Sequence, residues 1–402
     1  MRRNLVEFIY NGKDACPLCD EKSSFQSFFS SKKLVHGVSN DYLFSINIVG
    51  CPNCRHVFLN PIPDEDQLLL YYSDCFPKNT SGCFFYDEKK RIALLEGVLK
   101  EGDTYCEIGS NANSLVDKYI SLKAKKVIMI EPNEQCRSDV PDLDSVHPNS
   151  IDVFAAFGVL EHLINVRGFI QTLKTKLKSG AQVIVEVPNV DEYDHNFTNL
   201  LFWEHVHHFS RENLVSLFEE VGFRATSWSR SCSAPLCMLA TFELVADGDE
   251  AFLQNRDLTF QSVRNGVEKI RTFQQCLNEI CESIQRRANK NQATIIYGAN
   301  EITSYLIGSL AESDNVIIID DDRSKKHMFS GFECLPAVEI DGFLRSRNLV
   351  VDYAIFSSHH LSSVFWKNLQ GTSLIESGHI EIDVLDYKFD PFFYRFNQGS
   401  LT

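Results

Sequence analysis

The chain has 402 residues, of which 44% are hydrophobic, and a formal net charge of −15 at pH 7. This apolar content is enough to bury several cores, so a disordered chain is excluded and two or three domains are expected. The negative charge argues against nucleic acid or an anionic membrane as an obligate partner, because association would begin with long-range repulsion.

The sequence carries no targeting or membrane signal that we can identify. The amino terminus lacks an apolar run of signal-peptide length, and no stretch approaches the ~20 apolar residues of a membrane span. The chain contains 13 cysteines, and most of them lie inside apolar segments, as reduced core thiols do. We therefore expect a cytoplasmic protein.

Four cysteines near the amino terminus form two C-P-x-C knuckles separated by 31 residues: Cys16, Cys19, Cys51 and Cys54. In each knuckle the two-residue spacer lets both thiolates face one point, and two knuckles complete a tetrahedral site typical of Zn²⁺. Because the intervening loop is long, His36 or His56 is an alternative to one thiolate, and free thiols or disulfides are the non-metal alternatives. We expect a zinc-binding domain over residues 1–70, with a structural ion.

A helix capped by Asp64 and a second helix over residues 87–99 lead to the most informative stretch, TYCEIGSNANSL at residues 104–115. It predicts a strand, a tight turn at Gly109 and a helix, and a second buried strand over residues 125–130 ends in Glu131. An acid at the tip of the second strand suits a ribose diol, because one carboxylate accepts hydrogen bonds from both hydroxyls. The pattern lacks the further glycines of a dinucleotide turn, and an ordinary βαβ unit is the alternative.

Two later segments are expected beside that turn. A buried strand over residues 151–157 ends in Gly158 and is followed by Glu161 and His162, and a further strand covers residues 180–187. The segment LFWEHVHHFS at residues 201–210 then places three histidines and a glutamate among aromatic residues, which suits a proton-transfer group. Its spacing does not match a helical zinc pair, and an aromatic packing loop is the non-catalytic alternative.

The carboxyl-terminal part predicts a connecting helix and another α/β domain. Apolar residues spaced by three and four between residues 260 and 284 indicate one long helix within 251–292. Residues 293–402 repeat the order of strand, glycine turn, helix, strand and acid, with Gly298 at the turn and strands at 293–297, 315–319 and 350–356. This domain suits a nucleotide-monophosphate-like or sugar ligand. Its acidic run at residues 320–322 could bind such a ligand, but the favoured interpretation is a solvated strand end.

The turn EIGSN, the segments VLEH and EVPN, the loop EHVxxFS and the YGAN turn, together with the thiol knuckles, resemble the three-domain nucleotide-sugar C-methyltransferases. The resemblance implies an α/β chain with an amino-terminal zinc-binding domain, a class I methyltransferase Rossmann-like core over residues 86–250 and a Rossmann-like substrate-binding domain over residues 293–402. It implies S-adenosylmethionine and Zn²⁺ as cofactors, a small-molecule substrate that in this family is a nucleotide sugar, and no nucleic-acid or membrane partner. We also expect a monomer.

Carried over residue by residue, the resemblance makes His205 the base, with Glu204 beside it and His162 nearby. The residues expected to bind the cofactor are Glu107, Gly109, Ser110, Asn111, Glu131, Pro132 and Gly158. Phe202 and Trp203 stand where the family has tyrosine and histidine, so a phenol is missing from the loop. Oxygen or nitrogen methylation, an unrelated small acceptor, and a non-catalytic binder of nucleotide sugar or S-adenosylmethionine are the alternatives.

Overall fold

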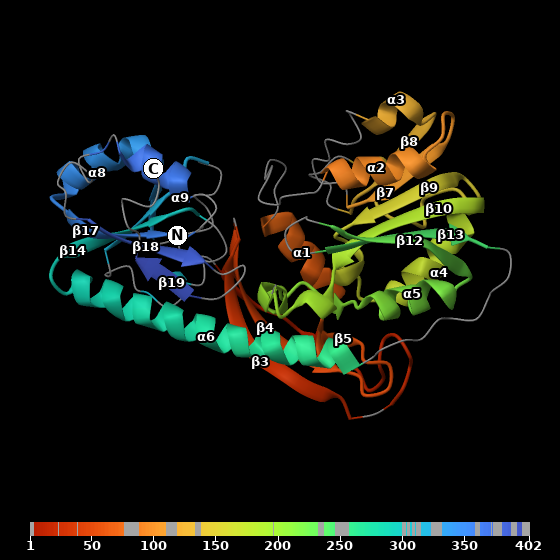
Figure 1. The fold of residues 1–402 in the computed structure, drawn as a ribbon, viewed down its shortest axis with the longest axis horizontal. Coiled ribbons are helices and arrows are strands. Elements are labelled where there is room, and N and C mark those ends of the chain that lie inside the picture. The colour runs from red at the N-terminus through yellow and green to blue at the C-terminus, as the bar shows by residue number, and fades with distance from the viewer. Residues whose placement is uncertain are drawn as a thin grey trace. The chain divides into compact units, whose positions relative to one another are not determined.

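The computed structural model describes residues 4–22, 24–37, 39–75, 88–109, 119–132, 138–195, 197–231, 237–245, 257–299, 303, 306–307, 310, 315–322, 332–357, 362–370, 372, 380–386 and 392–395. The chain divides into two compact units, shown in Figure 1. The larger unit comprises Glu7–Lys33 and Phe44–Val267, and the smaller unit comprises Met1–Val6, Leu34–Leu43 and Glu268–Thr402. The domain boundaries expected from the sequence stay predictions.

A six-stranded sheet in the order β12-β13-β10-β9-β7-β8 forms the centre of the larger unit. Its strands are β7 (Thr104–Ile108), β8 (Lys126–Ile130), β9 (Ile151–Phe157), β10 (Leu177–Pro188), β12 (Phe223–Ser231) and β13 (Cys237–Leu244). The strands from β7 to β10 are parallel to their neighbours, and β13 is antiparallel to both β10 and β12. Strands predicted in four of these places are confirmed. Because parallel strands end at one edge, the turns after β7, β8, β9 and β10 meet there.

Helices cover both faces of this sheet (Figure 1). They are α2 (Glu88–Val98) and α3 (Ser121–Lys123) on one side, and α4 (Val166–Lys176) and α5 (Arg211–Glu219) on the other. Leu95 of α2 packs with Tyr105 and Met129, whereas Ile170 of α4 and Leu217 of α5 belong to the cluster of the opposite face. The helix predicted directly after Gly109 lies outside the described residues.

The segment between the thiol knuckles was expected to be a loop, and this expectation is wrong. It forms two eleven-residue strands, β3 (Gln26–His36) and β4 (Asn40–Gly50). Alternate residues of β4, from Tyr42 through Phe44 and Ile46 to Ile48, are buried, which is the period-two pattern of a strand with one covered face.

The strand β4 belongs to a sheet with the order β1-β4-β5-β11, in which β3 also pairs with β4. The remaining elements of this part are β1 (Asn4–Glu7), β2 (Tyr10–Asn11), β5 (Val57–Leu59), β6 (Ile62–Pro63) and α1 (Glu65–Cys75). The helix α1 begins as predicted, because the Asp64 carboxylate accepts a hydrogen bond from the Gln67 backbone N–H at 3.3 Å. The last strand, β11 (His207–His208), comes from the histidine-rich segment and pairs antiparallel with β5.

The smaller unit contains a second six-stranded sheet, in the order β16-β15-β14-β17-β18-β19. The strands are β14 (Gln292–Tyr297), β15 (Val316–Ile319), β16 (Glu333–Leu335), β17 (Val350–Phe356), β18 (Glu381–Asp386) and β19 (Phe392–Arg395), with helices α8 (Ile340–Arg347) and α9 (Ser362–Leu369). The long helix α6 (Asp257–Ala288) begins in the larger unit and continues into the smaller one from Glu268. Pairing is parallel from β16 to β18, and the long helix and the three strands predicted here are confirmed. None of the helices in the described part of the chain has the length and apolar character needed to cross a membrane.

Candidate functional site

The turn after β7 lies against the turn after β9. Gly109 has a φ of +74°, and a Cβ built on it would lie 2.5 Å from Cγ2 of Val159. A side chain at position 109 is therefore excluded by both conformation and space. Gly158, with a φ of +70°, directly follows β9 and precedes Val159, and its N–H donates to the Glu186 carbonyl at 2.8 Å. Two expected cofactor residues thus share one edge of the sheet.

Glu107 is buried near the end of β7. Its carboxylate accepts a hydrogen bond from the Tyr105 hydroxyl at 2.5 Å, and burial together with this carboxylate raises the pKa of Tyr105 well above its usual value. Tyr105 therefore stays a hydrogen-bond donor at neutral pH. Ser110 and Asn111, which were also expected to line the cofactor, lie outside the described residues.

Glu131 and Pro132 follow the second strand, as predicted. The Glu131 backbone N–H is bonded to the Val140 carbonyl at 3.2 Å, and its half-buried side chain leaves the end of β8, while Pro132 is exposed. Burial is the main reason why the pKa of Tyr72 is raised well above its usual range, and the charges of Glu204, Glu161 and Glu131 add to the effect. Tyr72 therefore lies within electrostatic reach of both Glu131 and Glu204 of the histidine-rich segment.

The contacts of His162 determine which of its ring nitrogens carries the hydrogen, and its burial determines that the ring is neutral. It ends the short 3₁₀ helix η2 (Leu160–His162), and its Nδ1 lies 3.1 Å from the Glu204 carbonyl oxygen and 3.1 Å from the Tyr72 hydroxyl. A carbonyl oxygen only accepts, so Nδ1 carries the hydrogen and Nε2 keeps the lone pair of the neutral ring. Burial lowers the pKa of His162 to about 4, so the ring is neutral at pH 7.

Glu161 is the buried acid of this cluster. Burial raises the pKa of its carboxyl to about 8, and the charge of Glu186 adds to the shift. Its Oε1 lies 4.0 Å from Nε2 of His162, and among the described residues its buried Oε2 has no hydrogen-bond partner. Glu161, His162 and His205 offer ligand atoms within 4.8 Å of one another, a spacing that a cation can also bridge. A nitrogen whose lone pair binds a metal cannot accept a proton, so the two uses of His205 exclude each other.

His205 faces this cluster. Its ring is nearly parallel to that of Phe202 at a centroid distance of 5.0 Å and meets the ring of His162 edge to face at 4.9 Å. The other two histidines of the segment bind elsewhere: His207 Nδ1 lies 3.0 Å from Nε2 of His56, and His208 Nδ1 lies 2.8 Å from the Tyr193 hydroxyl. Of the three histidines, His205 is therefore the one placed beside His162.

Trp203 has a packing role. It is buried, stacks face to face on Phe44 of β4 and meets Tyr71 of α1 edge to face at 4.3 Å. The indole thus fastens the histidine-rich segment to the amino-terminal sheet.

Tyr72 supplies a phenol at His162, although Phe202 offers none, and it was not among the predicted site residues. It lies in the helix that begins after Asp64, and its position in the sequence gives no signal of contact with His162, 90 residues later. The available hint was a second aromatic hydroxyl, Tyr71 being followed by Tyr72, at the end of an otherwise aliphatic helix face.

The four knuckle thiols converge, as predicted. The Sγ atoms of Cys16 and Cys54 are 3.6 Å apart, those of Cys19 and Cys51 are 3.7 Å apart, and all four lie within 4.8 Å of one another. A tetrahedron with Zn–S bonds of 2.3 Å has edges of about 3.8 Å, so these spacings fit zinc. His56 was considered as an alternative ligand, and its Nε2 is instead directed at His207. The side chain of His36 lies outside the described residues.

Comparison with known proteins bears on part of the larger unit. Residues 63–227 match a family model described as a methyltransferase domain, which supports a methyltransferase domain in this part of the chain. No curated protein matches the chain.

Solved structures give fold-level likenesses. The N-methyltransferase NodS from Bradyrhizobium japonicum WM9, in complex with S-adenosyl-L-homocysteine, is 15% identical, with 44% of this chain and 97% of that chain covered and a TM-score of 0.35. An S-adenosylmethionine-dependent methyltransferase from Mesorhizobium loti is 13% identical, with 38% and 96% covered and a TM-score of 0.33. At these TM-scores the likenesses carry no argument about substrate or partners.

Proposed function

We propose that the methyltransferase domain moves a methyl group from S-adenosylmethionine to a carbon beside the ketone of a nucleotide-linked keto-deoxysugar. The observation that carries the proposal is the placement of His205 beside His162, whose Nδ1 in turn lies 3.1 Å from the Tyr72 hydroxyl. An imidazole that can accept a proton, near a phenol that can donate a hydrogen bond, supplies the two groups that deprotonation beside a ketone uses.

The residues at the sheet edge fit the cofactor. The turn at Gly109 has no room for a side chain and lets a ligand approach the backbone, and the Glu131 carboxylate at the end of β8 suits a ribose diol. When bound, S-adenosylmethionine supplies an electrophilic methyl group on a positively charged sulfur. We place Glu107, Gly109, Glu131, Pro132 and Gly158 around it, with Ser110 and Asn111 of the same turn.

The protein residues divide the remaining work. Neutral His205 accepts the proton from the substrate carbon, and the Phe202 ring beside it limits the directions that the imidazole can take. Tyr72, whose raised pKa keeps it protonated, donates a hydrogen bond to the enolate oxygen that forms. The enolate carbon then bonds to the methyl carbon, the carbon–sulfur bond breaks, and the ketone is restored. Glu204 binds sugar hydroxyls or orients His205.

We assign Zn²⁺ to Cys16, Cys19, Cys51 and Cys54, on the fit of the thiol spacings to a tetrahedral site. Four protein ligands leave no open position, so the ion is structural. We further assign substrate binding to the α/β domain of residues 293–402, whose turn at Gly298 has a φ of +103° at the carboxyl edge of its sheet. There the Asp320 carboxylate accepts hydrogen bonds from the backbone N–H groups of Ala299 and Asp322. These contacts support the interpretation that Asp320 is a strand-end group and not a ligand-binding residue.

The test combines binding and turnover. His205→Ala is expected to abolish methyl transfer to nucleotide-linked keto sugars, measured with radiolabelled donor, while the Kd for S-adenosylmethionine by calorimetry changes by less than a few-fold. His195→Ala is the matched control, because His195 is an exposed histidine of the same unit. Equal loss of binding and turnover would assign His205 a structural role.

Product NMR separates the remaining functions. A new carbon–carbon bond supports the proposal, and a methyl group on oxygen or nitrogen replaces it with the alternative chemistry. Absence of transfer from the wild-type protein to any acceptor of a sugar panel, with donor binding intact, would favour a non-catalytic binder.

A further inference from the structure

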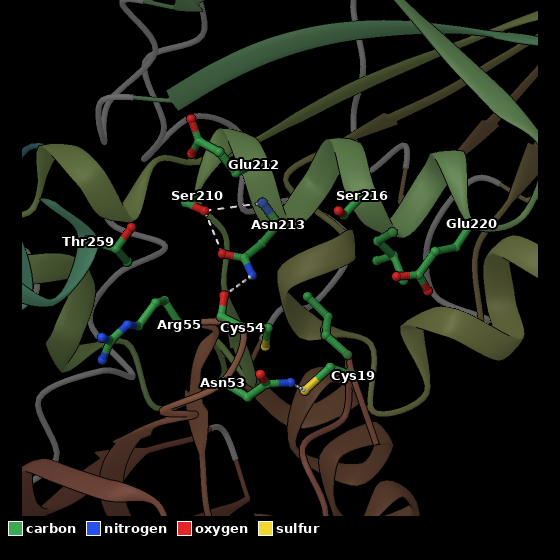
Figure 2. A pocket seen from close by; sticks show the side chains of 12 residues that line it. Cys19, Asn53, Cys54, Arg55, Ser210, Glu212, Asn213, Ser216, Glu220 and Thr259 are labelled. Atoms are coloured by element: carbon green, nitrogen blue, oxygen red, sulfur yellow. Dashed lines mark hydrogen bonds between the residues drawn. The ribbon is translucent and has the colours of Figure 1, made fainter. Parts of the chain in front are cut away.

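The second thiol knuckle is hydrogen-bonded to the helix that follows the histidine-rich segment. Asn213 of α5 is buried, and its Nδ2 donates to the Cys54 carbonyl at 3.0 Å, while its Oδ1 accepts from the Ser210 hydroxyl at 2.5 Å (Figure 2). Ser210 is the residue that caps α5 and ends the segment carrying His205. One amide side chain therefore spans the distance from a thiol ligand's backbone to the end of this segment.

A second connection joins the same knuckle to the middle of the segment. The Nε2 of His56, two residues after Cys54, lies 3.0 Å from Nδ1 of His207, and both rings are buried. The backbone is tied as well, because β5 pairs with β11, and the Leu59 N–H donates to the Val206 carbonyl at 2.9 Å. These contacts hold the residues directly after His205.

Packing joins the two parts in addition to hydrogen bonds. Cys16, Cys51 and Phe58 belong to the same apolar cluster as Phe209 and Leu217. A pocket of about 210 Å³ opens beside this junction, lined by both the knuckle and α5 (Figure 2). The junction thus has one apolar side and one side that solvent reaches.

We infer that Asn213 and His56 are positioning residues, which transmit the order of the filled thiol site to the segment that carries His205. The inference rests on the proposed function, in which His205 is the base. An ion bonded to all four sulfur atoms links the two knuckles, so metal binding orders the second knuckle and fixes the Cys54 carbonyl and the His56 ring. Displacing a base by about 1 Å can cost on the order of a hundredfold in rate. The metal site then governs turnover without touching the cofactor.

The test uses Asn213→Ala in the full chain. We expect kcat to fall tenfold or more, with the Kd for S-adenosylmethionine within twofold of wild type and one zinc per chain retained. Hydrogen–deuterium exchange is expected to speed up in residues 204–210 and to stay unchanged in β9. His56→Phe, which keeps an aromatic ring and loses the bond to His207, is expected to give the same pattern.

Asn165→Ala is the matched control. Asn165 caps α4 in the same unit, its side chain accepting the Gly168 N–H at 3.0 Å, so its loss costs comparable helix stability. Arg167 of α4 donates a hydrogen bond to the Leu18 carbonyl of the first knuckle, but among the described contacts α4 is not bonded to the second knuckle or to residues 204–210. Because Asn165→Ala leaves the Arg167 side chain in place, kcat and exchange in residues 204–210 should remain at wild-type values.

Two results would overturn the inference: wild-type kcat in Asn213→Ala, or exchange in residues 204–210 that does not respond to this substitution or to removal of zinc with a chelator. The exchange measurement needs no substrate. If wild-type protein transfers no methyl group, the proposed function fails, and exchange still decides whether the knuckle orders the segment.

Discussion

The buried carboxyl of Glu161 should make the stability of the larger unit depend on pH. Its pKa is 4.5 in an unperturbed chain and about 8 in the folded protein, chiefly because of burial. Between these values the folded state holds a proton that the unfolded state has released, so the stabilisation is complete at low pH and is lost as pH rises through 8. At about 1.4 kcal/mol per pH unit, the wild-type protein should lose about 2 kcal/mol between pH 6 and pH 8 through this group.

Glu161→Gln keeps the shape of the side chain and removes the titration. The free energy of unfolding of the variant minus that of wild type should therefore increase by about 2 kcal/mol from pH 6 to pH 8, and groups common to both proteins cancel in the difference. Urea unfolding followed by tryptophan fluorescence measures it, in a Trp366→Phe background so that only Trp203 and Trp228, both in the larger unit, report. A difference that is the same at both pH values would show that Glu161 is ionised in the folded protein and would refute the burial argument.

Two further substitutions test the anchoring of the segment and the cofactor turn. Trp203→Ala removes a buried indole stacked on Phe44 and should lower the free energy of unfolding by roughly 3–5 kcal/mol, whereas the half-exposed Trp228→Ala should change it by less than ~1 kcal/mol, both measured by urea unfolding. A similar decrease in the free energy of unfolding for both variants would show that the stack of Trp203 on Phe44 does not stabilise the fold. Glu131→Gln should raise the Kd for S-adenosylmethionine about tenfold, because a hydrogen bond to a charged group contributes roughly 1.5–3 kcal/mol, and unchanged affinity by calorimetry would remove Glu131 from the cofactor site.

The central sheet could be predicted because the sequence of each strand alone indicates a buried strand. Residues 104–108 and 151–157 are short apolar runs that end at glycines, and parallel strands of this kind need no knowledge of their partners to be recognised. The knuckle thiols could be predicted for a similar reason, since the C-P-x-C spacing brings each pair together by itself. In contrast, the prediction of a loop was wrong for the strands of residues 26–36 and 40–50. The described residues of β3 are exposed or half-buried, so this strand has no clear buried face that its sequence could show, and β4 is held by pairing with β5.

The partners of the histidine-rich segment could not be predicted, because they come from distant parts of the chain. Adjacent histidines in an extended stretch point in alternate directions, and the sequence does not say which direction faces the sheet edge. The structure resolves this through three separate partners: Tyr193 for His208, His56 for His207, and the ring of His162 for His205. Tyr72 could not be predicted for the same reason, because its partner His162 is also distant in the sequence.

The apolar cluster that contains Cys16, Cys51 and Phe58 continues into α5 and the central sheet without a polar boundary. A fragment that begins at residue 86 would therefore expose the apolar face of α5 and the aromatic residues of the histidine-rich segment to solvent. We expect such a fragment to aggregate. Recombinant expression of the larger unit should therefore include the residues from Glu7 onward, with zinc in the growth medium.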